Sequence, residues 1–181
     1  MSLYYFIASL PLLKWGEVPA IGTDDFAAAC ADHLSAALAP VAQGLATGAL
    51  PPGETPAFLS AWRNADNQLR NAVARQRAAR RNVDISRAQR PVGPFDLAIE
   101  DGVKESFSRR NPLEREQALD RIRWDKADEL AGFDPFALSA LLAYAVRLHI
   151  AQRWAALDAD AGREAARQLI EQGTREGNEN A

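Results

Sequence analysis

Cysteine, lysine and methionine are scarce in this chain of 181 residues. Cys30 is the single cysteine, which excludes an intramolecular disulfide framework and makes a reducing, cytoplasmic compartment the default expectation. Of the 21 basic residues, only three are lysines and the others are arginines. The formal net charge of −3 gives no global attraction to nucleic acid or acidic lipid. The length suits a single domain spanning residues 1–181.

The sequence also lacks the short motifs of common catalytic and metal sites. It contains no phosphate-binding loop, no GxGxxG or GxSxG, no paired CxxC or HxxxH, and no Glu-x-x-His pairs. Cys30 and His33 fall on one helix face, but two ligands do not make a zinc site, and like His149 they are most simply core residues. We therefore expect a non-enzymatic protein without metal or cofactor. An enzyme that uses these three residues stays a rival hypothesis.

The apolar run from residue 3 to residue 13 does not have the layout of a cleaved signal peptide. No basic residue precedes it, Pro11 interrupts it, and Lys14 and Glu17 follow it. We expect a short strand or helical turn instead. Its packed side chains are expected to be Tyr4, Tyr5, Phe6 and Ile7.

Helical periodicity dominates the remainder, and no window beyond the first residues alternates with period two. These patterns predict an all-α antiparallel bundle. The expected helices begin at Thr23 or Asp24 with a break or kink at Pro40, run from Thr55–Pro56 to about Asn82, and cover 96–107, 112–131, 135–157 and 158–172. The expected irregular segments are a loop at 46–55, a linker at 89–94 and a frayed tail at 173–181.

The strongest structural prediction is a helical hairpin between Asn111 and Trp154. Asn111, with Pro112 and Glu114 after it, has the pattern of a capped helix start, and Gly132 supplies a stop. Asp134 and Pro135 then repeat the cap-then-proline pattern. Because the connection is short, the two helices should be antiparallel neighbours.

The second helix of this hairpin, about 135–157, is apolar on nearly all sides. Such a helix lies either at the centre of a bundle or in a membrane. Arg147, His149 and Arg153 fall inside it, and each charged side chain would cost roughly 3 kcal/mol at the centre of a bilayer. We therefore predict a central bundle helix and no membrane span.

Basic charge is concentrated between Arg63 and Arg90, which hold eight arginines against Asp66 and Asp84, a net charge of 8 − 2 = +6. This basic helix, 63–90, could meet an acidic protein, bind a phosphate backbone, or pair with the acidic hairpin of the same molecule. No aromatic residue is interleaved with the arginines after Trp62, which disfavours nucleic acid. The predicted partner-binding residues are Arg70, Arg75, Arg77, Arg80, Arg81 and, on the hairpin, Trp124.

Four carboxylates on the first hairpin helix raise the question of a metal cluster. Asp120, Asp125, Asp128 and Glu129 are scattered around the helix and alternate with basic residues. That arrangement is typical of an exposed, ion-paired face. We expect an exposed face here and no metal.

Three segments of the chain resemble a bacterial family catalogued as domain of unknown function 2764. They are the opening YYFIASLPLL, the middle WRNADNQLRNAVARQRAAR and the hairpin LDRIRWDKADELAGFDPFALSALLAYAVRLHIAQRW. Members are similar in a Y-Y-x-x-A-S-L-P start, an L-R-N basic helix and an R-W-D-x-x-D-E-L...F-D hairpin.

The resemblance implies a role beside a V/A-type rotary ATPase, because genes of that family tend to lie among the genes of this enzyme. It implies protein subunits of the ATPase as partners and a non-catalytic subunit or assembly factor, peripheral to the membrane through the complex. One form of this hypothesis gives the chain part of the role of the helical C subunit (d in the vacuolar enzyme), which couples the shaft to the membrane ring. The alternative is a nucleic-acid-binding helical module that uses the basic helix 63–90.

Overall fold

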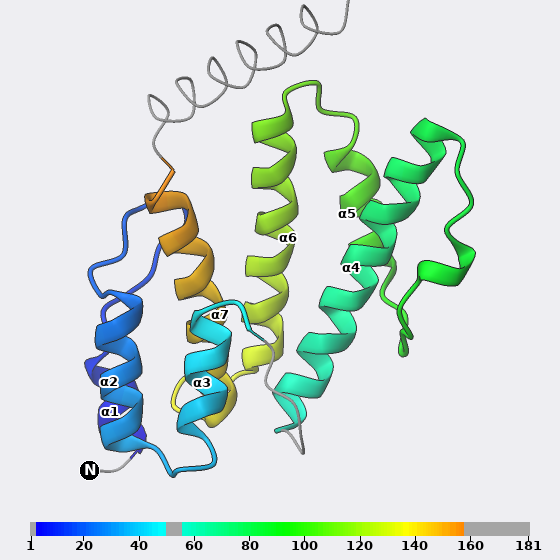
Figure 1. The fold of residues 1–181 in the computed structure, drawn as a ribbon. Coiled ribbons are helices and arrows are strands. Elements are labelled where there is room, and N and C mark those ends of the chain that lie inside the picture. Colours follow the sequence, from blue (N-terminus) through cyan, green and yellow to red (C-terminus); the bar gives the residue numbers. More distant parts are fainter. Residues whose placement is uncertain (1–2, 50–55, 158–181) are drawn as a thin grey trace, which may run out of the picture.

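The computed structural model describes residues 3–49 and 56–157, and over these residues the chain is all helical, with no strand (Figure 1). The predicted all-α class is therefore confirmed. In chain order the elements are α1 (Leu3–Ser9), α2 (Thr23–His33), α3 (Ala39–Ala46), α4 (Ala57–Arg81), a 3-10 turn η1 (Ser86–Ala88), α5 (Leu97–Ser106), α6 (Pro112–Ala131) and α7 (Leu138–Ala155).

Helix α7 is enclosed by its neighbours, as its all-round apolar sequence predicts. Leu141, Leu142 and Leu148 are fully buried, and α6, α3 and α2 pack around the helix. Burial of each leucine contributes about 1.5–3 kcal/mol. No helix in the part of the chain that the structure describes is long and apolar enough to cross a membrane.

The hairpin of α6 and α7 is confirmed, with one difference in its boundaries. The side chain of Asn111 accepts a hydrogen bond from the Leu113 amide at 2.9 Å, and Gly132 ends α6 with φ 78°. The predicted second start at Pro135 is three residues early, because α7 begins at Leu138. Asp134 accepts from the Phe136 amide at 2.9 Å and thereby caps a turn that precedes the helix.

A second apolar cluster holds α4, α5 and α6 together on the other side of the molecule (Figure 1). Leu69 of α4, Val103 of α5 and Leu119 of α6 lie in it. Glycine weakens a helix interior, but Gly102 of α5 has a packing role. A Cβ there would lie 2.9 Å from Cδ1 of Ile122, so glycine allows α5 to approach α6 closely.

The N-terminal region differs from the sequence predictions in three ways. Residues 3–9 form a short helix, so the helical alternative holds and the strand does not. Of the aromatic residues that were expected to pack, only Phe6 is buried, and Tyr4 and Tyr5 are exposed. Gly22, and neither Thr23 nor Asp24, is the N-cap of α2. Pro40 does not kink α2; it lies in the first turn of the separate helix α3, where a proline costs no hydrogen bond.

The long basic helix α4 ends within a residue of the prediction, at Arg81, with Asn82 in the left-handed conformation. The predicted helix 96–107 corresponds to α5. The predicted loop 46–55 begins one residue later than expected, because α3 extends to Ala46. Residues 50–55 of it lie outside the described residues. The predicted helix 158–172 and tail 173–181 also lie outside them.

The predicted linker 89–94 is irregular, as expected, but it is attached to α4 through side-chain amides. Asn64, Gln68 and Asn71, which we call the α4 amides, lie on one face of the helix, and each bonds to main-chain groups of the segment 90–96. Each amide donates its NH₂ to a carbonyl at 2.6–2.8 Å and accepts a main-chain N–H at 2.7–2.9 Å. The linker is thus fixed along α4 before α5 begins.

We predict that Asn71→Ala lowers the free energy of unfolding by on the order of 1–3 kcal/mol. The main-chain carbonyl and N–H of Arg90 both lose their hydrogen-bond partner in this variant. Asn67→Ala is the matched control. The side-chain amide of Asn67 makes one exposed contact, with the Arg90 guanidinium. Both variants replace asparagine by alanine in the same helix, so the gain in helix propensity is equal. Urea unfolding followed by circular dichroism measures both. Equal midpoints for the two variants would contradict the structural role of the amide.

Candidate partner-binding cleft

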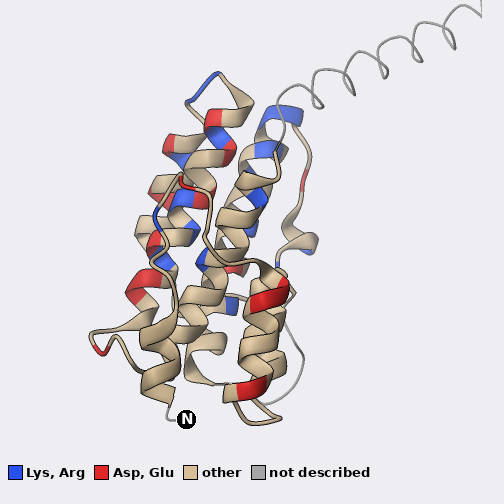
Figure 2. Cartoon of the chain, turned by 90° about the vertical axis from the view of Figure 1, so that its left-hand side faces the viewer, with Lys and Arg blue, Asp and Glu red and all other residues tan. Residues whose placement is uncertain are grey.

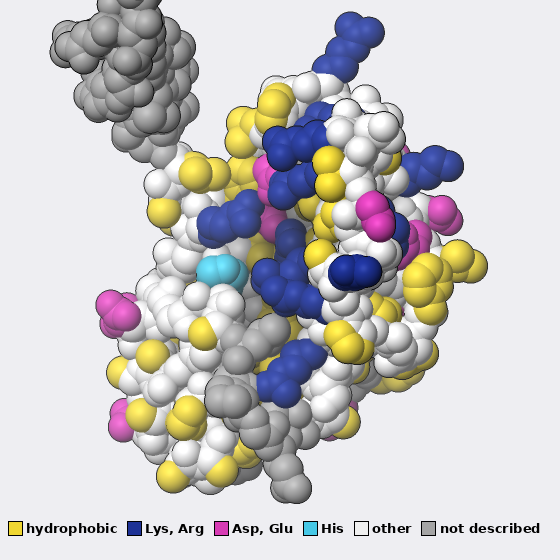
Figure 3. Space-filling model, turned by 45° about the vertical axis from the view of Figure 1, so that its right-hand side comes forward, with side chains coloured by type: hydrophobic (Ala, Val, Ile, Leu, Met, Phe, Trp, Pro, Cys, Tyr) yellow, Lys and Arg dark blue, Asp and Glu magenta, His cyan; other side chains and the backbone are white. Residues whose placement is uncertain are grey.

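An open cleft separates α4 from α6 and α7, and basic side chains gather along it (Figure 3). Its outer part has a volume of about 680 Å³, and its inner part, beside the end of α3, has about 140 Å³. Arg70, Arg123 and Arg153 line both parts, and they come from α4, α6 and α7 respectively. The charged residues of the molecule concentrate on the α4–α6 side, while α1–α3 carry few (Figure 2).

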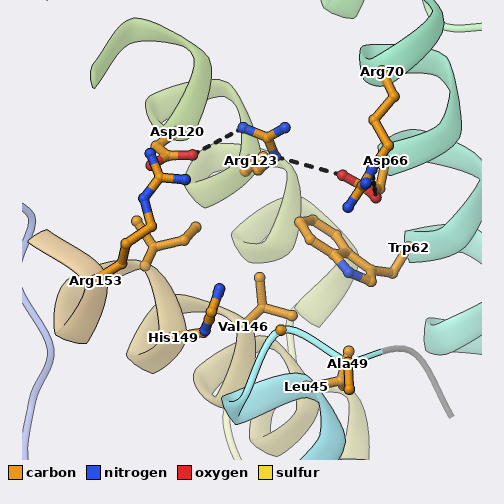
Figure 4. Close-up of a pocket in the computed structure, with 12 residues that line it drawn as sticks. Leu45, Ala49, Trp62, Asp66, Arg70, Asp120, Arg123, Val146, His149 and Arg153 are labelled. Carbon is orange, nitrogen blue, oxygen red and sulfur yellow. Dashed lines mark hydrogen bonds and ion pairs between the residues drawn. The ribbon is translucent and has the colours of Figure 1, made fainter. Parts of the chain in front are cut away.

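Two buried carboxylates hold the guanidinium groups at the bottom of this cleft (Figure 4). Arg123 donates from Nη1 to Asp120 at 2.9 Å and from Nε to Asp66 at 3.5 Å. Asp66 also accepts from Arg70, and Asp120 from Arg153 at 2.9 Å. We call these five residues the buried ion-pair chain. It connects α4 to α6 and α7, and both of its carboxylates pair with arginines and orient them.

Asp120 is the most deeply placed member of the chain, with 1% of its surface exposed. Besides the two arginines, it accepts a hydrogen bond from the indole Nε1 of Trp154 at 2.9 Å. Both carboxylate oxygens therefore have partners, which a buried charge requires. The prediction that Asp120 belongs to an exposed face is wrong. The other three carboxylates are exposed and paired as predicted: Asp125 with Arg121, Asp128 with Arg147 and Glu129 with Lys126.

His149 lies in the wall of the inner cleft, where α3 ends. A Cβ at Gly48, whose φ is 76°, would lie 2.6 Å from the imidazole, so only glycine fits beside the ring. Burial lowers the pKa of His149 below its ordinary 6.5, and the charges of Arg153 and Arg123 act in the same direction. A hydrogen bond with the backbone of Ala46 and the charge of Asp120 oppose the shift. The imidazole is therefore neutral at neutral pH.

The structure divides the predicted partner-binding arginines of α4 between two sides of the helix. Arg75 donates to both carboxylate oxygens of Glu100 on α5 at 2.6 Å. Arg80 donates to the Phe107 carbonyl at 2.7 Å and lies over the ring of that residue. These two arginines therefore bind groups of the same molecule, as one of the three alternatives predicted. These partners belong to α5 and the residue after it, whereas the prediction placed them on the acidic hairpin.

Arg70, Arg77 and Arg81 lie on the cleft side of α4, where their spacing of seven and four residues aligns them. Arg77 is 64% exposed and has only a long contact with Glu116, at 3.6 Å. Arg81 is exposed and has no ion-pair partner among the described residues. This side of α4 therefore offers charge that the molecule itself leaves mostly unused.

Trp124, the sixth predicted partner-binding residue, is only 7% exposed. Its ring contacts Trp15 edge to face, with centroids 5.4 Å apart, and Arg147 lies over it. The side chain packs the N-terminal segment against α6, and in this structure it lacks the surface that direct contact with a partner requires.

Cys30 is a core residue, as expected, whereas His33 is only half-buried. Cys30 is fully buried and burial raises the pKa of its thiol to about 12, while the His33 ring packs on Phe6 with centroids 4.8 Å apart. Over residues 3–49 and 56–157, no group of three His, Cys, Asp or Glu side chains is placed to hold a metal ion.

Sequence reasoning missed Asp66, Asp120, Arg123 and Arg153 as components of a site. The available signal was position: Asp66 falls on the α4 face that also carries Trp62, and Asp120 lies on the same α6 stripe as Trp124. A carboxylate inside an apolar stripe must be paired if the stripe is buried.

Two of the three cleft walls, α6 and α7, come from the C-terminal half of the chain. Residues 96–176 match the family model described as Protein of unknown function (DUF2764). The matched region includes Asp120, Arg123, His149 and Arg153, whereas α4 lies outside it. The chain has no match among the curated proteins or the solved structures.

We predict that Asp120→Asn lowers the free energy of unfolding by about 2–3 kcal/mol, because Arg123 keeps its buried position with less compensating charge. Asp125→Asn, the same change in an exposed pair of the same helix, should cost less than about 0.5 kcal/mol. Urea unfolding monitored by circular dichroism compares the two. A similar decrease in the free energy of unfolding in both variants would show that the buried ion-pair chain stabilises the fold no more than an exposed ion pair does.

We predict a loss of stability on mild acidification that originates in His149. Because its folded pKa is lowered, the unfolded state binds more protons below the ordinary pKa of 6.5, so the free energy of unfolding falls as the pH drops through that value. The variant His149→Gln should show a smaller change over the same pH range. Urea unfolding on both sides of pH 6.5 tests this, and greater wild-type stability just below that pH would contradict it.

Proposed function

We propose that the protein is a non-catalytic helical subunit or assembly factor of a bacterial V/A-type rotary ATPase, in the cytoplasm, and that it binds its partner through the cleft. The observation that carries the proposal is the division of the α4 arginines. Arg75 and Arg80 bind groups of the same molecule, whereas Arg77 and Arg81 line the cleft from one side of α4. Arginine is enriched at protein interfaces, where its guanidinium group can bind a carboxylate through two hydrogen bonds.

The ATPase part of the proposal rests on the resemblance of the N-terminal segment, the L-R-N helix and the hairpin to a family associated with genes of that enzyme. The family match over residues 96–176 supports the resemblance in the hairpin. On this proposal the chain takes part of the role of the C/d coupling subunit or assists its assembly. The buried ion-pair chain suits such a role, because it keeps the cleft walls in a fixed relation.

The alternative, a nucleic-acid-binding module built on residues 63–90, has less support. Arg75 and Arg80 are withdrawn from any continuous basic stripe. Among the described residues that line the cleft, Trp62 is the one tryptophan, tyrosine or phenylalanine, and it is 7% exposed, so it offers no stacking surface for bases.

We predict that an affinity pull-down of the tagged protein from its native host recovers catalytic-head or shaft subunits of the V/A-type ATPase, identified by mass spectrometry. Recovery should survive moderate salt, because a packed subunit contact depends less steeply on ionic strength than phosphate binding does. Absence of ATPase subunits, under conditions in which the ATPase itself stays intact, would overturn the proposal. Recovery of nucleic acid that is lost steeply with salt would favour the alternative.

A further inference from the structure

We propose that the outer cleft is the docking groove for an acidic amphipathic helix of a protein partner. This deepens the proposed function, and it rests on that proposal only in taking the partner to be a protein. The charge, the floor and the shape of the groove each contribute an independent argument.

The charge of the groove is complementary to an acidic segment. Five arginines line the outer cleft, and Glu116 is the acidic residue among its described lining residues. The two carboxylates of the buried ion-pair chain offset only part of the charge of its three arginines, so positive charge is in excess. Arg77 and Arg81 form the outer rim on α4, and Arg153 of α7 faces them across the groove. Because guanidinium groups stay protonated at all physiological pH values, this potential is permanent. A carboxylate that approaches the rim can accept two parallel hydrogen bonds from one guanidinium.

The floor of the groove is aliphatic, which a purely anionic ligand would not require. Val73 of α4 and the buried Leu119 of α6 lie at its base. Val83 and Ile85, which follow α4, extend this apolar surface at one end, and Val83 is 57% exposed. An apolar stripe on the partner would cover the exposed parts of Val73, Val83 and Ile85, and burial of that apolar area would contribute to binding. The combination of apolar floor and basic rim selects an amphipathic, acidic ligand.

The shape favours a helix over an extended strand. The rim from Arg70 to Arg81 runs along one helix, and eleven steps of 1.5 Å give a length of about 17 Å, or three turns of a partner helix. The described residues contain no strand, and so they present no sheet edge to which an extended peptide could add. An amphipathic helix laid in a groove uses residues spaced i, i+3, i+4 and i+7 as its anchors.

The test is fluorescence anisotropy with a labelled peptide of Leu, Ala and Glu, about three helical turns long, with Leu on one face and Glu on both flanks. Two further probes are a peptide of the same composition in scrambled order and a single-stranded DNA of the same charge. We expect the amphipathic peptide to bind at least about tenfold more tightly than the scrambled one, because only it can cover the floor while it reaches the rim.

The decisive variant is Arg77→Glu combined with Arg81→Glu, which reverses the rim on exposed positions. It should weaken binding of the amphipathic peptide by about tenfold or more. Lys104→Glu with Arg109→Glu is the matched control, since it makes the same charge change at exposed positions that do not line the cleft, and its affinity should equal that of the wild type. Val83→Asn should weaken the amphipathic peptide more than the scrambled one. If the charge reversal disturbs folding, as judged by circular dichroism, Arg77→Gln with Arg81→Gln replaces it.

Three results would overturn the inference: equal affinity for the two peptides, equal loss in the cleft and control variants, or tighter binding of the DNA than of the amphipathic peptide. Failure of the ATPase proposal gives a different pattern, in which the peptide binds in the cleft but the pull-down recovers no ATPase subunits. Conversely, if the Arg77→Glu, Arg81→Glu variant recovers ATPase subunits as the wild type does, the groove inference fails and the ATPase proposal stands.

Discussion

The arrangement of the described helices depends on two buried carboxylates that are paired with partly exposed arginines. Asp66 and Asp120 lie on different helices, and Arg123 bridges them, so α4 is connected to α6 and α7 by charge at a point between the two apolar clusters. Charges at such a position are costly unless every one is paired. Their partners Arg70 and Arg153 complete the pairing and reach toward solvent. The same interaction thus fixes the relation of the helices and produces the basic interior of the cleft.

The two apolar clusters explain why a cleft exists at all. One cluster surrounds α7 and includes the start of α4, while the other joins the middle of α4 to α5 and α6, so α4 and α6 contribute to both. Because α4 packs chiefly on α5 and α6, it diverges from α7 along its length (Figure 1). Arginine side chains border the cleft that results. A core residue in this space would be exposed to water. Arginine suits it, since its stem covers apolar surface while its head stays solvated.

Helix positions could be predicted from the sequence wherever local chemistry decides them. The Asn111 cap, the stop at Gly132 and the length of α4 all depend on neighbours within a few residues. The burial of Asp120 could not be predicted in this way, because its partner Arg153 lies on α7 and is brought near only by tertiary packing. Arg75 was similarly ambiguous: nothing local says that Glu100 will lie opposite it. The exposed arginines were identified as a group, but which of them face the cleft follows from the docking of α5.

The α4 amides have a consequence for how the chain can vary. They contact only main-chain groups of the segment 90–96, so they place no demand on its side chains. The N–H groups of Arg90, Gly93 and Asp96 donate hydrogen bonds to the α4 amides. Pro91 and Pro94, which have no N–H, stand at positions where no such bond is made. The attachment therefore tolerates prolines and almost any outward-facing residue. The side chains of Arg90 and Asp96 do have further partners, in Asn67 and Lys126. The exposed positions between them, such as Phe95, can change in evolution without loss of the path of the segment, and they are permissive places for new contacts.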